Sequence, residues 1–114
     1  MEPAIAVKGK SDLEYFFEIS VDFMAIISKD GKVEKISKYC SEVLGWNQKE
    51  FLTHEWSMFV HAADLKSILN AISSEAIFSG IRGLEVRFKC KNGNYRWAEC
   101  NCRFIKEKQV YILT

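Results

Sequence analysis

Four cysteines have the widest chemical repertoire in this chain: Cys40, Cys90, Cys100 and Cys102. They could form two disulfides, but nothing in the sequence suggests export, and a chain of this length does not need cross-links to fold. A structural zinc site needs closely spaced ligand pairs such as Cys-x-x-Cys, and Cys100-Asn101-Cys102 does not provide one. We therefore expect reduced thiols that act as small apolar core residues, and no metal site.

The histidines and carboxylates form no catalytic arrangement. His54 and His61 are interpreted as structural, and no long helical-bundle pattern surrounds His54 that would suit a phosphoacceptor histidine. The sequence has neither a glycine-rich phosphate loop nor a supported Ser/His/Asp order. Glu99 is expected on a solvated strand face or paired with Arg87 across a hairpin. We expect no enzymatic activity from this domain.

The composition of the 114 residues indicates one globular domain. With 48% hydrophobic residues, 27% charged residues and a single proline, the chain is typical of an ordered protein with a core. Sixteen basic and 15 acidic residues leave a net charge of +1, which favours neither nucleic acid nor an anionic membrane as a partner. The longest apolar run, residues 23–27, is too short to span a membrane, and no signal peptide is recognisable. These features predict a cytoplasmic domain.

The first half of the chain is expected to form short helices and strands. Residues 1–10 look like a linker or cloning remnant, and residues 11–22 form an N-terminal helical cap ahead of a core at 23–114. Ser11 and Glu14 have the spacing of a capping box. Two strand-like runs, 23–27 and 32–36, flank the hairpin signal Asp30-Gly31. Short helices are expected over 39–44, ending at Gly45, and over 47–52, with Asn47 as N-cap and Glu50 at N3.

The second half predicts one longer helix and three strands. After an irregular or single-turn segment at 53–61, Asp64 is expected to cap a helix over 64–78, whose apolar stripe is Leu65, Ile68, Leu69 and Ile72. From residue 84 the period changes to alternation, so that Leu84, Val86, Phe88 and Cys90 share a face. Asn92-Gly93 is a preferred type I′ hairpin dipeptide, and strands are expected over 95–105 and 108–114.

Together these elements predict an α+β fold. Five antiparallel strands form one sheet, and the small helices and the longer helix pack on one of its faces. The hollow between that helix and the sheet is where a small ligand would bind. The apolar stripe of the helix can serve as core, as pocket wall, or as both.

The order and spacing of several motifs resemble the PAS domain family from about Ser11 to Thr114. The matching segments are residues 17–23, Asp30-Gly31, Glu42-Val43-Leu44-Gly45-Trp46 with Glu50-Phe51, residues 60–65, and Lys91-Asn92-Gly93-Asn94-Tyr95-Arg96-Trp97. The family often has proline where Val21 and Ala62 stand, and asparagine where Ser37 stands. These departures concern turns and caps, and Ser37 is expected to alter how the helix after it begins.

The resemblance also bears on cofactors. Asn101-Cys102-Arg103-Phe104-Ile105 looks like the motif whose cysteine bonds to flavin in LOV photosensors, but it falls in a predicted strand, and residues 53–61, where that motif belongs, contain no cysteine. Haem-binding PAS domains usually supply an axial histidine from the long helix, and residues 64–78 contain none. Haem and a photoactive flavin are therefore disfavoured, and the cofactor remains unknown.

The resemblance implies a sensory or regulatory module, and two hypotheses follow. In the first, a small, mostly apolar molecule is sensed and relayed to a C-terminal output domain, as in histidine kinases. The alternative is a ligand-free dimerisation or protein-interaction module. The candidate pocket residues are Tyr39, Trp56, Leu65, Ile68, Leu69, Ile72, Phe88 and Trp97. The candidate homodimer contacts are Leu13, Phe16 and Phe17.

Overall fold

A computed structural model describes residues 11–114, and the expected linker at 1–10 lies outside the described residues. The five strands are β1 (Ala25–Ser28), β2 (Val33–Ile36), β3 (Ile81–Lys89), β4 (Tyr95–Ile105) and β5 (Val110–Leu113). They form one antiparallel sheet in the order β2-β1-β5-β4-β3. The predicted α+β architecture is confirmed.

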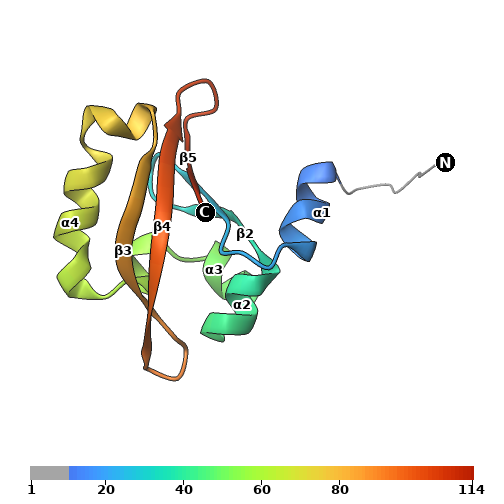
Figure 1. The fold of residues 1–114 in the computed structure, drawn as a ribbon. Coiled ribbons are helices and arrows are strands. Elements are labelled where there is room, and N and C mark those ends of the chain that lie inside the picture. The colour runs from blue at the N-terminus through green and yellow to red at the C-terminus, as the bar shows by residue number, and fades with distance from the viewer. Residues whose placement is uncertain (1–10) are drawn as a thin grey trace.

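The helices lie before β1 and between β2 and β3. They are α1 (Asp12–Ile19), α2 (Lys38–Leu44), α3 (Gln48–Leu52) and α4 (Ala62–Ile72), with single 3₁₀ turns at η1 (Trp56–Phe59) and η2 (Glu75–Phe78). In Figure 1, α4 runs alongside β3, whereas α1 lies on the opposite side of the molecule, near β2. The helix α1 is in contact with α2. The elements between β2 and β3 therefore cover one face of the sheet, and α1 sits at its margin.

Local sequence explains the ends of three helices as expected. Ser11 with Glu14 and Asn47 with Glu50 each form a reciprocal capping box at the starts of α1 and α3. Gly45 ends α2 in the left-handed conformation, with φ of 89°. Each of these contacts pairs a backbone group that the helix itself leaves without a partner.

The longest helix differs from its expected boundaries. Its N-cap is His61, whose Nδ1 accepts a hydrogen bond from the Ala63 amide at 2.9 Å, so Asp64 lies inside the helix and does not cap it. The helix ends at Ile72, and the Ser74 hydroxyl donates to the Ala71 carbonyl at 2.7 Å. A serine hydroxyl that binds a nearby backbone carbonyl competes with the backbone hydrogen bonds that would extend the helix. This explains why residues 75–78 form a separate turn.

Both tight hairpins use the same three-residue turn. In the β1–β2 turn the Gly31 amide donates to the Ser28 carbonyl, and in the β3–β4 turn the Gly93 amide donates to the Cys90 carbonyl. The glycines have φ of 95° and 94°, and among the described residues Gln109 alone, of those with a side chain, has a positive φ. Asn92 therefore does not adopt the type I′ conformation that its dipeptide predicted. The turn is instead a type I turn followed by a left-handed glycine.

Several strand boundaries also differ from expectation, and the starts of three strands differ by two or three residues. β3 begins at Ile81, three residues before the predicted start, β1 begins at Ala25, and β5 begins at Val110 because residues 106–109 form the turn after β4. The register of β3 against β4 shifts between Ile81 and Leu84, where Gly83 has φ of 72°. This irregularity hides the strand from a search for strict alternation.

Candidate functional site

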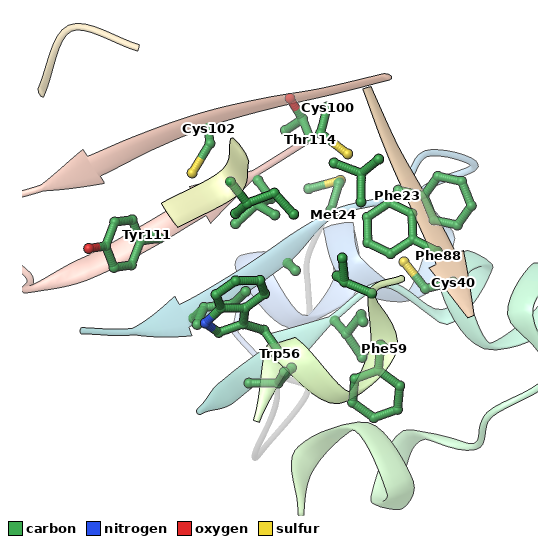
Figure 2. Close-up of a pocket in the computed structure, with 18 of the residues that line it drawn as sticks. Phe23, Met24, Cys40, Trp56, Phe59, Phe88, Cys100, Cys102, Tyr111 and Thr114 are labelled. Carbon is green, nitrogen blue, oxygen red and sulfur yellow. The ribbon is translucent and has the colours of Figure 1, made fainter. Parts of the chain in front are cut away.

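A cavity of about 120 Å³ lies between the covered face of the sheet and the helices packed on it (Figure 2). All five strands, α2, α3, η1 and α4 contribute to its wall. Its lining residues are mostly large and apolar, and comprise Phe23, Met24, Ala25, Ile27, Val33, Ile36, Cys40, Leu44, Phe51, Trp56, Phe59, Val60, Ile68, Ile72, Leu84, Val86, Phe88, Cys100, Cys102, Tyr111, Leu113 and Thr114. The hollow is thus central to the domain and is not confined to the space under α4.

Strand alternation explains which side chains reach this cavity. In β3, Leu84, Val86 and Phe88 line the cavity, whereas Glu85 between them is exposed. In β4, Cys100 and Cys102 line it, and both are at least 93% buried. The β4 residues between and beside them, including Glu99, are exposed. Alternation therefore produces an apolar inner face on an otherwise charged pair of strands.

Three thiols in the cavity wall are neutral at physiological pH. Burial raises the pKa of Cys100 to about 12 and that of Cys102 to about 11, and it also raises the pKa of Cys40. The proximity of Cys102 and Cys40 raises the Cys100 pKa further. Thiolates are the nucleophilic form of cysteine, so these protonated thiols act as soft apolar surface.

The remaining polar atoms at the cavity wall are few and uncharged. None of the lining residues that the structure describes has a carboxylate, an ammonium or a guanidinium group. The indole of Trp56, the phenol of Tyr111 and the hydroxyl of Thr114 are the hydrogen-bonding side chains at its margin, as Figure 2 shows. A charged ligand would lose its hydration here without gaining a counter-charge. The wall therefore suits a neutral molecule.

An ion pair fixes the start of α4 to the edge of the sheet. The Asp64 carboxylate accepts three hydrogen bonds from Arg87: from the backbone amide at 2.8 Å, from Nε at 3.2 Å and from Nη2 at 2.7 Å. The His61 amide donates to the Arg87 carbonyl at 2.9 Å. Both backbone groups of Arg87 are thus paired by the segment before and within α4, which protects this part of the edge strand β3. The Arg87 hydrogen bonds lower the Asp64 pKa.

This ion pair replaces the pairing expected for Glu99. Arg87 binds Asp64, and its guanidinium stacks over Trp97 at 4.8 Å from the ring centroid. In the β3–β4 register Glu99 lies opposite Glu85, and it is exposed, as the alternative interpretation predicted.

The comparisons with known proteins fit this geometry. The sequence matches the model of the PAS fold over residues 33–113. The chain belongs to the PAS fold family. A comparison with proteins of curated function gives no match. The element order, the sheet order and the family match agree, so the resemblance proposed from the motifs is confirmed.

Solved PAS structures share the fold at low sequence identity. The PAS domain of an HTR-like protein from Haloarcula marismortui is 17% identical, with a TM-score of 0.75 over 89% of this chain and 84% of that one. A domain of a sensory box sensor histidine kinase/response regulator from Geobacter sulfurreducens is 19% identical, with a TM-score of 0.68 over 89% and 88% of the two chains. The PAS-B domain of Drosophila melanogaster Cycle, with bound ethylene glycol, is 19% identical, with a TM-score of 0.69 over 81% and 94%.

Four of the eight candidate pocket residues line the cavity of this PAS domain: Trp56, Ile68, Ile72 and Phe88. The other four do not. Tyr39 packs behind the wall against Phe23, at 5.5 Å between ring centroids, and Leu65 packs against the core cluster around Ile68. Leu69 is 49% exposed, and Trp97 is 65% exposed on the outer face of β4. An apolar helical stripe does not distinguish a wall residue from its neighbour one turn away, which explains the errors at Leu65 and Leu69.

The cavity residues that the sequence reading missed include Cys100, Cys102 and Cys40. Extending the alternation of β4 back from its end would have placed Cys100 and Cys102 on the same face as Val86 of the partner strand. No local signal identifies Cys40, because it reaches the cavity from a short helix whose position depends on tertiary packing.

The candidate dimer residues of α1 divide into two groups. Leu13 is 44% exposed and Phe16 is 60% exposed, whereas Phe17 is buried against its own chain. Ile19 and Val21 extend the exposed apolar surface beyond the predicted residues. We call Leu13, Phe16, Ile19 and Val21 the α1 patch. Phe17 is a core residue and does not belong to this patch.

The histidines and thiols have structural contacts. His61 caps α4, as described above, and the His54 Nδ1 lies 2.8 Å from the Glu50 carbonyl, to which it donates. All four cysteines are free and buried. Within residues 11–114, no group of three or more histidines, cysteines and carboxylates is arranged to hold a metal ion. The described helices also include none with the length and apolar character of a membrane span.

Proposed function

We propose that this PAS domain is the sensory or regulatory input module of a signal-transduction protein such as a histidine kinase, and that it has no catalytic activity. A small neutral molecule binds in the central cavity and alters an output domain attached after Thr114. The observation that carries the proposal is the cavity itself, an apolar space of about 120 Å³ bounded by the sheet and four helical elements. Close-packed cores contain few voids of this size, so it needs an explanation.

The cavity restricts the class of ligand by charge and by size. Its wall offers apolar carbon, three neutral thiols and a few hydroxyl and indole groups, so ions are excluded by their desolvation cost. An apolar cavity of about 150 Å³ binds benzene or xenon. The ligand proposed here is therefore a neutral apolar molecule with about the bulk of a single ring, which sulfur and aromatic side chains contact favourably.

The position of β5 supports a relay from the cavity to an output domain. This strand lies at the centre of the sheet between β1 and β4, and Tyr111, Leu113 and Thr114 line the cavity. The Thr114 amide and carbonyl are hydrogen-bonded to Asn101 of β4. A segment that follows Thr114 would start at the cavity wall, so a shift of the wall on ligand binding would reach it directly. One structural relative comes from a sensor histidine kinase/response regulator, which is consistent with this proposal.

Binding of two probes tests the proposed ligand site. Xenon and benzene are titrated into ¹⁵N-labelled protein, and we expect saturable shifts at amides of Val86, Phe88, Cys100 and Cys102. The variant Ala25→Ile fills the cavity from β1 and should abolish these shifts. Ala76→Ile, at an exposed position on η2, is the matched control and should leave them unchanged.

Two results would contradict ligand sensing. Saturating xenon and benzene could leave the cavity amides unshifted, or both probes could bind equally well to Ala25→Ile and wild type. Native mass spectrometry of protein purified from cells complements the titration, because a tightly bound natural ligand appears there as added mass.

A second candidate function is self-association through α1. The four α1 patch residues are 44–75% exposed and lie within nine positions of one another, an exposure that favours a protein contact. In this reading the domain is a homodimerisation or interaction module. Sedimentation velocity distinguishes the two readings: Phe16→Ser with Ile19→Ser should shift a dimer to monomer, whereas Lys66→Ser on α4 should not. A dimer that survives the double change does not use the patch.

We also propose a cytoplasmic location. Its support is the set of four free, buried thiols, which a reducing compartment maintains. The near-neutral charge of the chain gives no reason to invoke nucleic acid or a membrane surface as a partner.

A further inference from the structure

Ser37 is a buried serine at the N-cap of α2, but its hydroxyl does not cap the helix. It is the N-cap residue of α2, where serine usually accepts a hydrogen bond from the first turn, yet its side chain makes no capping bond. The residue is completely inaccessible to solvent. Its hydroxyl is instead directed at the segment that joins α1 to β1.

Three contacts use the full hydrogen-bonding capacity of this hydroxyl. The Ser37 Oγ donates to the Asp22 carbonyl at 2.7 Å and accepts from the Met24 amide at 3.2 Å. The Cys40 Sγ lies 3.2 Å away. A serine hydroxyl has one proton and two lone pairs, and its proton is used on Asp22. The Cys40 thiol is therefore the donor in the third contact, in agreement with the raised pKa that keeps it protonated.

The same three partners belong to two different regions. Cys40 and Met24 line the cavity, where Figure 2 shows both side chains at its wall. Asp22 is two residues after Ser20, the C-cap of α1, and its amide donates a hydrogen bond to the Ser20 hydroxyl at 3.1 Å. One buried oxygen atom thus joins the wall of the cavity to the connection that holds α1.

We propose that the Ser37 hydroxyl is a latch that couples the cavity to α1. A molecule in the cavity displaces Cys40 and Met24, weakens their hydrogen bonds to Ser37 and so loosens the hold of Ser37 on Asp22. The helix α1, with its exposed patch, is then released from α2. This inference rests on the ligand-sensing function proposed above and assigns the route by which occupancy reaches the N-terminal side.

Two features of the structure explain why occupancy of the cavity would loosen α1. The latch oxygen is fully buried, so a displaced partner cannot be replaced by water without opening the site. α1 has a single buried side chain, Phe17, and otherwise presents a largely exposed surface. A helix with only one buried side chain depends strongly on each additional tether.

Hydrogen–deuterium exchange of the α1 amides, measured with and without saturating benzene, tests the latch. In wild type, benzene should speed exchange in residues 12–19 about fivefold to tenfold, the change expected when one buried hydrogen bond weakens. Ser37→Ala should exchange at the faster rate already without benzene and respond little to it. Ser41→Ala, on the next turn of α2, where the hydroxyl accepts a hydrogen bond from the Gln48 side-chain amide at 3.1 Å, is the matched control and should behave as wild type.

A second variant separates coupling from simple loss of structure. Cys40→Ala removes one of the two links to the cavity and leaves the Met24–Ser37 and Ser37–Asp22 hydrogen bonds, so α1 should exchange slowly without benzene and should accelerate less with benzene than in wild type. Cys90→Ala removes a buried thiol that does not line the cavity and should keep the benzene response.

The outcomes distinguish failure of the latch from failure of ligand sensing. Benzene that shifts the cavity amides without changing α1 exchange overturns the latch and leaves the ligand site standing. A benzene response as large in Cys40→Ala as in wild type, or one retained in Ser37→Ala, also overturns it. Absence of any probe binding in wild type refutes ligand sensing, and the latch falls with it.

Discussion

At the scale of single residues, the Asp64–Arg87 pair has the clearest energetic role. It closes three hydrogen bonds in a site where both side chains are largely covered, at 12% and 28% exposure. Exposed ion pairs contribute little to the free energy of unfolding. A carboxylate that also accepts a hydrogen bond from a backbone amide of an edge strand contributes more. This pair positions the α4 wall of the cavity against β3.

Asp64→Asn should lower the free energy of unfolding by about 1–3 kcal/mol near neutral pH, since hydrogen bonds to a charged group are lost. The Asp64 pKa is lowered in the folded protein, so its contribution is present above the unfolded pKa and is lost as the pH falls through the folded value. Urea unfolding between neutral pH and pH 2 should therefore show wild type converging on the variant in acid. A constant difference at every pH would contradict this role for the carboxylate.

The buried thiols should respond to pH in the opposite direction. The folded pKa values of Cys100 and Cys102, about 12 and about 11, are above the ordinary thiol pKa of 9.0. Above that value the unfolded chain loses protons that the folded chain keeps, so stability present below pH 9.0 is lost as the pH rises toward these folded values.

Urea unfolding of wild type should show a free energy of unfolding that falls as the pH rises above 9.0. In the variant with both Cys100→Ala and Cys102→Ala, this free energy should fall less steeply with pH. In the native protein, a disulfide reagent should modify neither thiol faster than the protein opens. Rapid modification of either thiol under native conditions would be the contrary result.

At the scale of elements, residue patterns predicted where helices and strands occur better than where they end. The capping boxes at Ser11 and Asn47 were predicted correctly because each motif is complete within four residues of sequence. The helix expected over 64–78 was wrong at both ends. Its start depends on an imidazole cap, and Asp64 had the right chemistry for a cap but is bound by Arg87 from a strand 23 residues away. Such a partner is visible only after folding.

The β3–β4 turn gives a test at this scale. Gly93 has φ of 94°, a conformation that costs roughly 1–2 kcal/mol for a residue with a side chain. Gly93→Ala should lower the unfolding free energy by about that amount in urea titrations, and Gly93→Asn should lower it less, because asparagine tolerates this region. A Cβ added at position 93 would have no atom within 4 Å, so no steric clash is expected. A loss of stability much larger than about 1–2 kcal/mol would therefore contradict backbone strain as the cause.

At the scale of the whole molecule, the sequence predicted the sheet, the helical face and a hollow between them. Alternation in 84–90 and the helical stripe around Ile68 were sufficient for that architecture. The exact wall was not predictable, because Cys40, Phe51 and Phe59 reach it from short elements whose placement depends on long-range packing. For the same reason, Trp97 looked like a wall residue and lies outside.

Filling the cavity should change stability in a way that ligand binding reproduces. A ligand that binds only the folded state adds RT ln(1 + [L]/Kd), about 2.7 kcal/mol at a hundredfold excess over Kd. Thermal unfolding of wild type should therefore shift upward with benzene. Ala25→Ile, whose added carbon atoms occupy the hollow, should show no such shift. Equal shifts in the two proteins would place benzene elsewhere on the molecule.

The sheet order has a consequence for how the protein is made. β5, the last of the five strands of this sheet in chain order, lies between β1 and β4 and joins the β1–β2 hairpin to the β3–β4 hairpin. During translation these two hairpins remain without their shared neighbour until residues 110–113 have left the ribosome. The domain therefore closes late, and a nascent chain stalled before β5 presents two unpaired strand edges to the chaperones around it.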